Sequence, residues 1–133
     1  MLQTPVTTTS IYAALLAFLF LALSIRVMLA RRRGRVNLGE GTSEGLKRRI
    51  RAHGNFAEYT PIALILMALL ELQGAGGFML NLIGLLLLAG RVAHAVGFGR
   101  VPENLALRGI GIVLTMLAII LAGLGLLLIA VFG

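Results

Sequence analysis

Hydrophobic and polar positions in this chain do not alternate; the apolar residues gather in long continuous segments. These segments are residues 11–30, 59–72, 78–98 and 110–132. The first is interrupted only by Ser24 and Arg26, and the last is the most apolar of the four. An α-helix needs roughly 20 apolar residues to cross the hydrocarbon core of a membrane. Three segments meet that length, so the pattern predicts membrane-spanning helices.

The second segment is too short unless its helix begins earlier, near Leu46. Residues 47–58 are mostly polar, and they would then form the first half of a helix about 40 Å long. Glycine-rich linkers separate the segments, and Ser43 is suited to cap the second helix. The sequence therefore predicts an all-α membrane protein, a single domain over residues 1–133. Its expected helices cover about residues 8–31, 46–73, 76–98 and 104–132.

Composition supports this interpretation. Of the 133 residues, 59% are hydrophobic, 13% are charged and none is cysteine. Ordinary soluble domains are about half apolar and about one quarter charged. This composition argues against a soluble globular domain, a disordered chain and a disulfide-stabilised secreted domain. It also excludes cysteine nucleophiles and thiolate metal sites in this chain.

Basic residues are confined to two of the linkers and the helix ends beside them. The chain has 12 Lys and Arg residues against 5 acidic ones, a net charge of +7. The basic residues surround the first and third linkers, whereas both termini and the second linker have no Lys or Arg. The positive-inside rule then predicts cytoplasmic linkers and external termini. Arg31-Arg32-Arg33 directly after the first span indicates a retained anchor rather than a cleaved signal peptide.

Charge and composition also bear on location and partners. Many arginines with abundant Ala, Gly and Leu are typical of a GC-rich bacterial genome, so we expect the bacterial inner membrane. Topology alone can explain residues 31–35, where membrane lipid headgroups would pair with the arginines. No basic stripe with interleaved aromatic residues is present on a soluble surface, so nucleic acid is not an expected partner.

Some polar residues inside the predicted spans need a further explanation. Arg51, Asn55 and Glu58 are spaced i, i+4 and i+7, which places them on one side of the second helix, with Tyr59 adjacent. A charge at bilayer depth costs roughly 2.5–3.5 kcal/mol, so such residues usually face a bundle interior or a cavity. Taken singly, the structural alternatives are that Arg51 reaches the headgroups and that Glu58 neutralises an arginine.

The third and fourth helices add polar residues near the same end. Arg91, His94 and Phe98 are spaced i, i+3 and i+7, and His94 alone could be an ordinary interior histidine. Arg108 falls in the first turn of the fourth helix, where the helix dipole favours anions, so another interaction should explain it. The cations outnumber Glu58, which predicts a site for an anionic ligand. Two histidines without a carboxylate cluster do not predict a metal site.

Residues 51–61 resemble the signature of the MAPEG family, the membrane-associated proteins in eicosanoid and glutathione metabolism. The family pattern is R-A-x-x-N-x-x-E-x-x-P, and residues 91–94 look like the second motif of the family. The resemblance implies a homotrimer of four-helix subunits with glutathione bound between adjacent subunits, near the cytoplasmic side. It also implies that the glutathione thiol reacts with a lipophilic electrophile or a peroxide.

The resemblance further implies roles for individual residues. Glutathione-binding residues of one subunit would be Arg51, His53, Asn55, Glu58 and Tyr59, with Arg91 and His94 lining the same cleft and Arg26 reaching in from a neighbouring subunit. Arg108 would be the catalytic residue that stabilises the thiolate. Phe98 occupies the place of a tyrosine usual in eicosanoid-forming members, which argues against a dedicated eicosanoid synthase. The alternative is a non-enzymatic membrane protein of the same fold that binds an anionic lipid or another thiol, or acts as a scaffold.

Overall fold

The computed structural model describes residues 6–133 and consists of four long α-helices. They are α1 (Thr7–Gly34), α2 (Glu44–Leu72), α3 (Gly77–Gly99) and α4 (Leu105–Phe132). Each is long and apolar enough to cross a membrane, and the described residues include no β-strand. The predicted all-α, four-span fold is confirmed. The second helix begins before Leu46, because the Ser43 hydroxyl accepts a hydrogen bond from the Leu46 amide and caps the helix.

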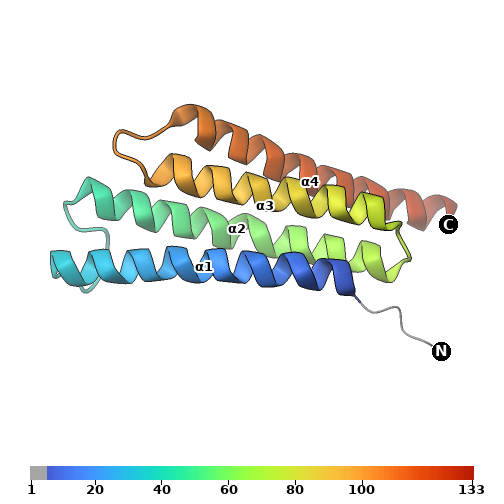
Figure 1. Ribbon diagram of the computed structural model, residues 1–133, viewed down its shortest axis with the longest axis horizontal. Helices are drawn as coiled ribbons and strands as arrows, with labels where there is room; N and C mark the ends of the chain where they lie inside the picture. The colour runs from blue at the N-terminus through green and yellow to red at the C-terminus, as the bar shows by residue number, and fades with distance from the viewer. Residues whose placement is uncertain (1–5) are drawn as a thin grey trace.

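The helices run antiparallel along one long axis (Figure 1). The α1–α2 and α3–α4 linkers lie at one end, and the α2–α3 turn, the start of α1 and the chain's C-terminus lie at the other. Both basic linkers therefore share one end, which we call the basic end. Within the described residues, α2 and α3 contact each other and both outer helices, whereas α1 and α4 do not touch. Side chains on facing surfaces of α2 and α3 are thus the most enclosed.

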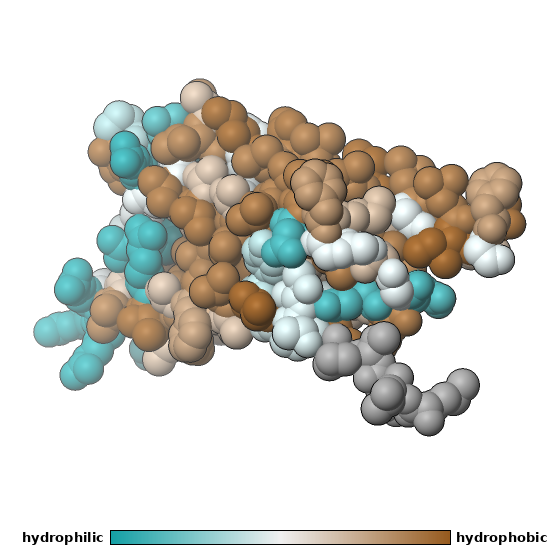
Figure 2. Space-filling model, turned by 45° about the vertical axis from the view of Figure 1, so that its right-hand side comes forward, coloured by the Kyte–Doolittle hydropathy of each residue, from teal (hydrophilic) through white to brown (hydrophobic). Residues whose placement is uncertain are grey.

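The outer surface of the bundle is mostly apolar. Large hydrophobic side chains such as Phe18, Ile65 and Leu127 are more than half exposed. Figure 2 shows hydrophilic residues gathered at the basic end and a second hydrophilic group toward the opposite end, with hydrophobic residues over most of the rest of the visible face. Lipid tails are as apolar as these side chains, so exposing the side chains to lipid carries no hydrophobic cost. The helices therefore need not bury all of them against one another.

Glycines let α3 and α4 pack closely. A Cβ atom added at Gly111 would lie 2.5 Å from the backbone nitrogen of His94, and one at Gly90 would lie 2.9 Å from the Gly111 carbonyl oxygen. Both distances are too short for a side chain, so the two backbones meet at these residues. Gly109 and Gly123 face open space instead.

A carboxylate from α2 caps the first turn of α1 at the opposite end. Val6 provides no side-chain cap, but Glu71 accepts hydrogen bonds from the backbone amides of Thr8 at 2.8 Å and Thr9 at 2.7 Å. Glu71 is only 9% exposed. An anion at a helix N-terminus is favourable both for the unpaired amides and for the helix dipole. Glu71 therefore joins α1 to α2 and has its own charge satisfied.

Replacing Glu71 with Ala is expected to lower the thermal unfolding temperature of the detergent-solubilised protein. The loss corresponds to about 1–2 kcal/mol, as for other removed N-caps. Glu71→Gln keeps an acceptor oxygen, so its unfolding temperature should lie between those of the wild type and Glu71→Ala. Glu40→Ala, which removes an exposed linker carboxylate, is the control. Circular dichroism melting measures the effect, and equal melting temperatures for Glu71→Ala and Glu40→Ala would contradict it.

Candidate functional site

A buried arginine on α3 is the centre of the candidate site. Arg91 is 1% exposed, and its Nη2 donates to Asn55 Oδ1 of α2 at 2.7 Å. Its Nη1 makes a longer contact of 3.5 Å with Thr115 Oγ1 of α4, and its guanidinium lies 5.9 Å from the Phe56 ring centre. Among residues 6–133 its Nε has no acceptor and no carboxylate forms an ion pair with it. The side chain thus joins three helices and keeps an unneutralised positive charge.

His94 lies one turn beyond Arg91 and is equally enclosed. It is 1% exposed, and its Nδ1 has no hydrogen-bond partner within the described part of the chain. The ring packs against Phe98 with 5.5 Å between centroids. The absence of a side chain at Gly111 allows α4 to approach the His94 backbone. His94 and Arg91 are therefore held at fixed positions by the close α3–α4 contact.

Arg108, at the start of α4, has a carboxylate partner that sequence reasoning missed. Its Nη1 donates to Glu103 Oε2 at 3.1 Å, and its guanidinium lies 4.5 Å from the Phe98 ring centre. The same Glu103 oxygen is 3.9 Å from Arg48 Nη1 of α2. This contact explains how an arginine is tolerated at a helix N-terminus. A glutamate next to the cap residue Asn104 was the available signal in the sequence.

The polar residues of α2 divide between two directions. Successive residues are about 100° apart around a helix, so Asn55 is rotated about 40° from Arg51, and Glu58 about 20° the other way. Asn55 turns inward to Arg91, whereas Arg51 and Glu58 are exposed and form no hydrogen bond or ion pair with the described residues. Tyr59 is half-buried beside them. The predicted polar side is thus partly in the bundle and partly on its surface.

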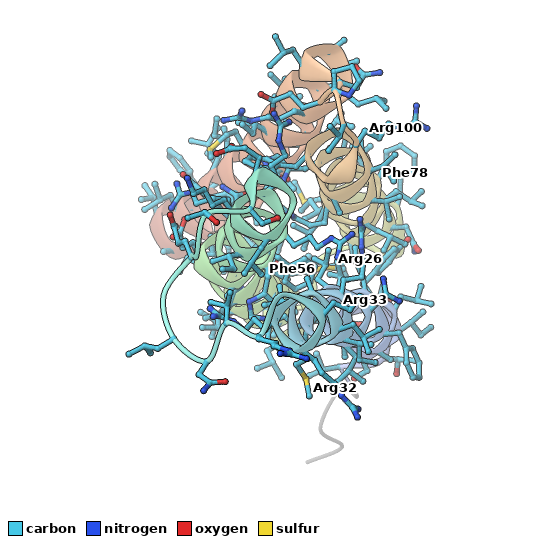
Figure 3. All side chains as sticks on the ribbon, turned by 90° about the vertical axis from the view of Figure 1, so that its left-hand side faces the viewer. Arg26, Arg32, Arg33, Phe56, Phe78 and Arg100 are labelled. Atoms are coloured by element: carbon cyan, nitrogen blue, oxygen red, sulfur yellow. The ribbon has the colours of Figure 1, made fainter. Side chains whose placement is uncertain are left out.

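His53 and Arg26 contact other parts of the bundle. His53 Nε2 is 2.9 Å from Ser24 Oγ of α1, and its ring stacks on Phe20 with 4.8 Å between centroids. Arg26 extends from α1 toward α3 (Figure 3), where a Cβ at Gly99 would lie 2.7 Å from its Nη2. A cation there suits the negative end of the α3 dipole. The structure thus brings Asn55 to Arg91 and places both His94 and Arg108 against the Phe98 ring, but it directs His53 toward α1.

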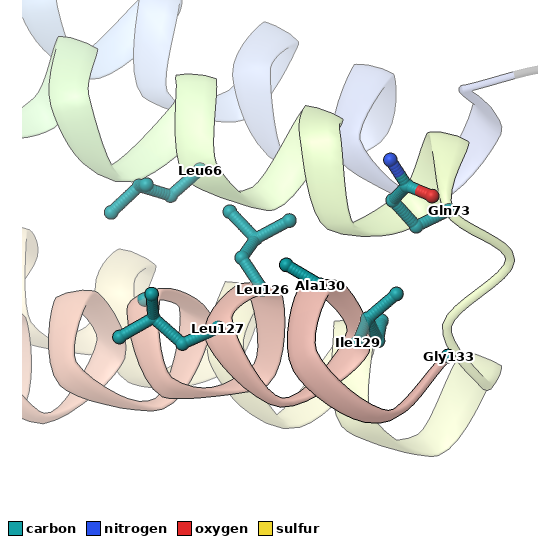
Figure 4. A pocket seen from close by; sticks show the side chains of 8 residues that line it. Leu66, Gln73, Leu126, Leu127, Ile129, Ala130 and Gly133 are labelled. Atoms are coloured by element: carbon teal, nitrogen blue, oxygen red, sulfur yellow. The ribbon is translucent and has the colours of Figure 1, made fainter.

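Two grooves lie away from these polar residues. The larger, about 590 Å³, runs between α2 and α4 at the end opposite the basic one, and its lining includes Leu66, Leu126 and Leu127 (Figure 4). The other, about 330 Å³, runs between α1 and α2 past Phe56 and Thr60. Thr60 Oγ1 is buried there with no hydrogen-bond partner in the described chain. Residues 6–133 contain no group of three His, Cys, Asp or Glu side chains able to hold a metal ion.

Comparison with known proteins agrees with this architecture. The MAPEG family model matches residues 9–128, which is nearly the whole chain. The chain belongs to the MAPEG family. It is also similar to the inner membrane protein YecN of Escherichia coli K12, with 42% identity over 90 residues, 68% of this chain and 69% of YecN. YecN of the O6:H1 strain CFT073 matches to the same extent. The resemblance carried by residues 51–61 and 91–94 is thereby confirmed at the level of the family.

The packing of α3 against α4 beside the candidate site can be tested with a matched pair of glycine substitutions on α4. Gly111→Ala is expected to destabilise the protein by about 1–3 kcal/mol, because the new methyl group would overlap the His94 backbone. Gly109→Ala places the same methyl group in open space and should be neutral or stabilising by up to about 1 kcal/mol. Thermal melting in detergent compares them. Equal melting temperatures would mean that the Gly111 contact is not tight.

Proposed function

We propose that this MAPEG protein is a glutathione-dependent transferase or peroxidase that activates the glutathione thiolate for attack on a lipophilic electrophile or hydroperoxide. The observation that carries the proposal is the excess of guanidinium groups at the basic end. Arg91 is buried without a carboxylate, and Arg48 and Arg108 share only Glu103. An enclosed site with a net positive charge favours an anionic ligand.

The chemistry of glutathione matches these side chains. It has two carboxylates, one amine and one thiol. Arginines bind carboxylates through paired hydrogen bonds, which suits Arg51 and Arg91, and the free carboxylate of Glu58 suits the amine. Asn55, Tyr59 and His94 supply further polar contacts. The resemblance also assigns His53 to the glutathione site, and its contact with Ser24 would have to be exchanged for one with the ligand.

Arg108 is the residue proposed to stabilise the thiolate. A free thiol has a pKa near 8.5, about 1.4 kcal/mol of stabilisation lowers it by one unit, and a nearby guanidinium can supply that much. In conjugation the thiol proton leaves to water and the thiolate sulfur forms a bond to the electrophilic carbon. The bond from that carbon to its leaving group breaks at the same time, and the leaving group departs with the electron pair. With a hydroperoxide the sulfur attacks the terminal oxygen, the O–O bond breaks and the alcohol leaves with a proton, which converts the thiol to a sulfenic acid. A second glutathione thiol then attacks that sulfur, and the products are the disulfide and water. The nucleophile belongs to the ligand, consistent with a chain lacking cysteine.

The exposed positions of Arg51 and Glu58 support a site between subunits. Both side chains point away from their own bundle and lack partners in the described chain. In a homotrimer a neighbouring subunit would enclose them, and Arg26 of that neighbour is the proposed additional contact. We also propose the bacterial inner membrane as the location, with both termini outside and the basic end cytoplasmic. The shared end of the two basic linkers and the name of the YecN relatives support this.

The groove between α1 and α2 is suited to the lipophilic substrate. Its apolar walls open toward the lipid side of the bundle, and Phe56 separates it from the Arg91 guanidinium. The Thr60 hydroxyl is buried, but Pro61 has no N–H to donate to the Ala57 carbonyl, and both Ala57 and Pro61 line the groove. An electrophile with one polar group would find a partner there, whereas a purely hydrocarbon chain would not.

A second candidate is a non-enzymatic protein that binds an anionic lipid or another thiol, or acts as a scaffold. The Glu103 contact favours it, because Arg108 already has an anionic partner. Under this alternative, Arg108→Ala would not alter any reaction of glutathione, and an anionic lipid would co-purify with the trimer or monomer.

Adding millimolar glutathione to the purified protein is expected to produce thiolate ultraviolet absorbance at a pH below the normal thiol range. Arg108→Ala should abolish that absorbance while retaining much of the binding, because its charge acts on the sulfur. Arg100→Ala, which removes an exposed linker cation outside the site, is the matched control. If the wild-type protein neither binds glutathione nor forms thiolate, the proposed function is wrong.

The role of Glu58 predicts a ligand-dependent effect. Glu58→Gln is expected to weaken glutathione binding about tenfold, the value of one charge-assisted hydrogen bond. It should leave the affinity for a glutathione analogue without the amino group nearly unchanged. Calorimetric titration of both ligands measures the difference. Equal losses for the two ligands would show that Glu58 does not recognise the amine.

A further inference from the structure

Glu103 is the carboxylate around which the basic end of α2 and α4 is arranged. Its Oε2 accepts from Arg108 Nη1 at 3.1 Å and lies 3.9 Å from Arg48 Nη1. The Glu103 side chain is 27% exposed, so the ion pairs are partly shielded from solvent. The α3–α4 linker, which carries Glu103, thus also forms ion pairs with Arg48 of α2 and Arg108 of α4.

The charges in this group do not balance. Two guanidinium groups share one carboxylate, and Arg48 Nε and Nη1 are buried without a hydrogen-bond partner in the described chain. None of the other acids pairs with this group among residues 6–133: Glu44 pairs with Lys47, Glu71 caps α1 at the opposite end, and no ion pair is formed by Glu40 or Glu58. The group therefore keeps a net positive charge after Glu103 has been counted.

The Arg108 guanidinium is hydrogen-bonded through Nη1, and its other N–H groups remain available to a ligand. Only its Nη1 has an acceptor among residues 6–133, and the face of the guanidinium lies against Phe98. Its side chain is 37% exposed. The Nε and Nη2 groups can therefore donate to a ligand without breaking the contact with Glu103.

We propose that Glu103 is a positioning residue for the thiol reaction: it fixes the Arg108 guanidinium beside the bound sulfur and offsets part of its charge. This inference rests on the proposed function, because it concerns how strongly Arg108 stabilises a thiolate. Arg48 acts through the same carboxylate. Because the negative charge of Glu103 is shared with Arg48, it neutralises the charge of Arg108 only in part.

Other charged or titratable groups face this cluster and define the background against which Glu103 acts. His94 of α3 shares the Phe98 ring with Arg108, and Arg26 of α1 lies against Gly99, just before the linker. Both are retained in the variants below. Changes in thiolate formation can then be attributed to Glu103 and Arg48.

The test is the pH at which bound glutathione becomes half thiolate, measured by ultraviolet absorbance. Glu103→Gln keeps an acceptor for Arg108 but removes the negative charge, so the midpoint should move roughly half to one pH unit lower, with roughly three- to tenfold more thiolate below it. Arg48→Gln leaves Glu103 to Arg108 alone and should move the midpoint higher. Glu40→Gln removes the same charge from the exposed first linker and should leave it unchanged.

Opposite shifts for Glu103→Gln and Arg48→Gln support the proposal, because a purely structural contact would not move the midpoint in two directions. Glu103→Asp restores the charge and is expected to return the midpoint toward that of the wild type. An unchanged or raised midpoint in a folded Glu103→Gln protein overturns the inference while leaving the proposed function intact.

A second measurement does not depend on glutathione chemistry. Without the Glu103 charge, Arg48 and Arg108 form an anion site, so inorganic sulfate should raise the melting temperature of Glu103→Gln more than that of the wild type or Glu40→Gln. Equal sulfate effects overturn the inference. If the wild-type protein forms no thiolate but sulfate selectively stabilises Glu103→Gln, the proposed function fails and the charge arrangement at Glu103 stands.

Discussion

The burial of Arg91 without a carboxylate partner among residues 6–133 is the constraint on which the rest of the candidate site depends. A guanidinium enclosed in an apolar bundle is unfavourable unless its N–H groups find acceptors. Asn55 and Thr115 supply two of them from different helices, so α2 and α4 must both approach α3 at this level. The approach of α4 requires Gly90 and Gly111, where no side chain separates the backbones. The positive charge that remains on Arg91 favours an anionic ligand in this region of the bundle.

The two ends of the bundle treat charge differently. Glu71 at one end is a buried anion whose oxygens accept two backbone amides from the first turn of α1, so its charge is used within the fold. At the basic end the guanidinium groups of Arg48, Arg91 and Arg108 exceed the carboxylates that face them. A structural ion pair needs no such excess. This difference supports the proposed anionic ligand at the basic end, whereas the Glu71 contact stabilises the fold.

The four spans could be predicted because apolar segments of sufficient length have few alternatives in a chain of this composition. The inward position of Arg91 followed from the cost of a charge in hydrocarbon. The direction of His53 did not, because its contact with Ser24 depends on which side of α2 faces α1, and a motif on one helix does not specify its neighbours. Glu103 was missed for a similar reason: its contacts with Arg48 and Arg108 arise from the path of a short linker. Arg51 and Glu58 are exposed on the bundle, so the sequence could indicate their chemistry but not their partners.

The position of Arg108 connects stability with reactivity. At a helix N-terminus the exposed amides already carry partial positive charge, and an added guanidinium is unfavourable there. Glu103 compensates for this, and Phe98 restricts where the guanidinium can go. A fully neutralised arginine would have little effect on a ligand, and an unpaired one would have no fixed direction. Because Glu103 is divided between Arg108 and Arg48, Arg108 is oriented while part of its charge remains. Preorganised charge of this kind stabilises an anion without the reorganisation that water would require.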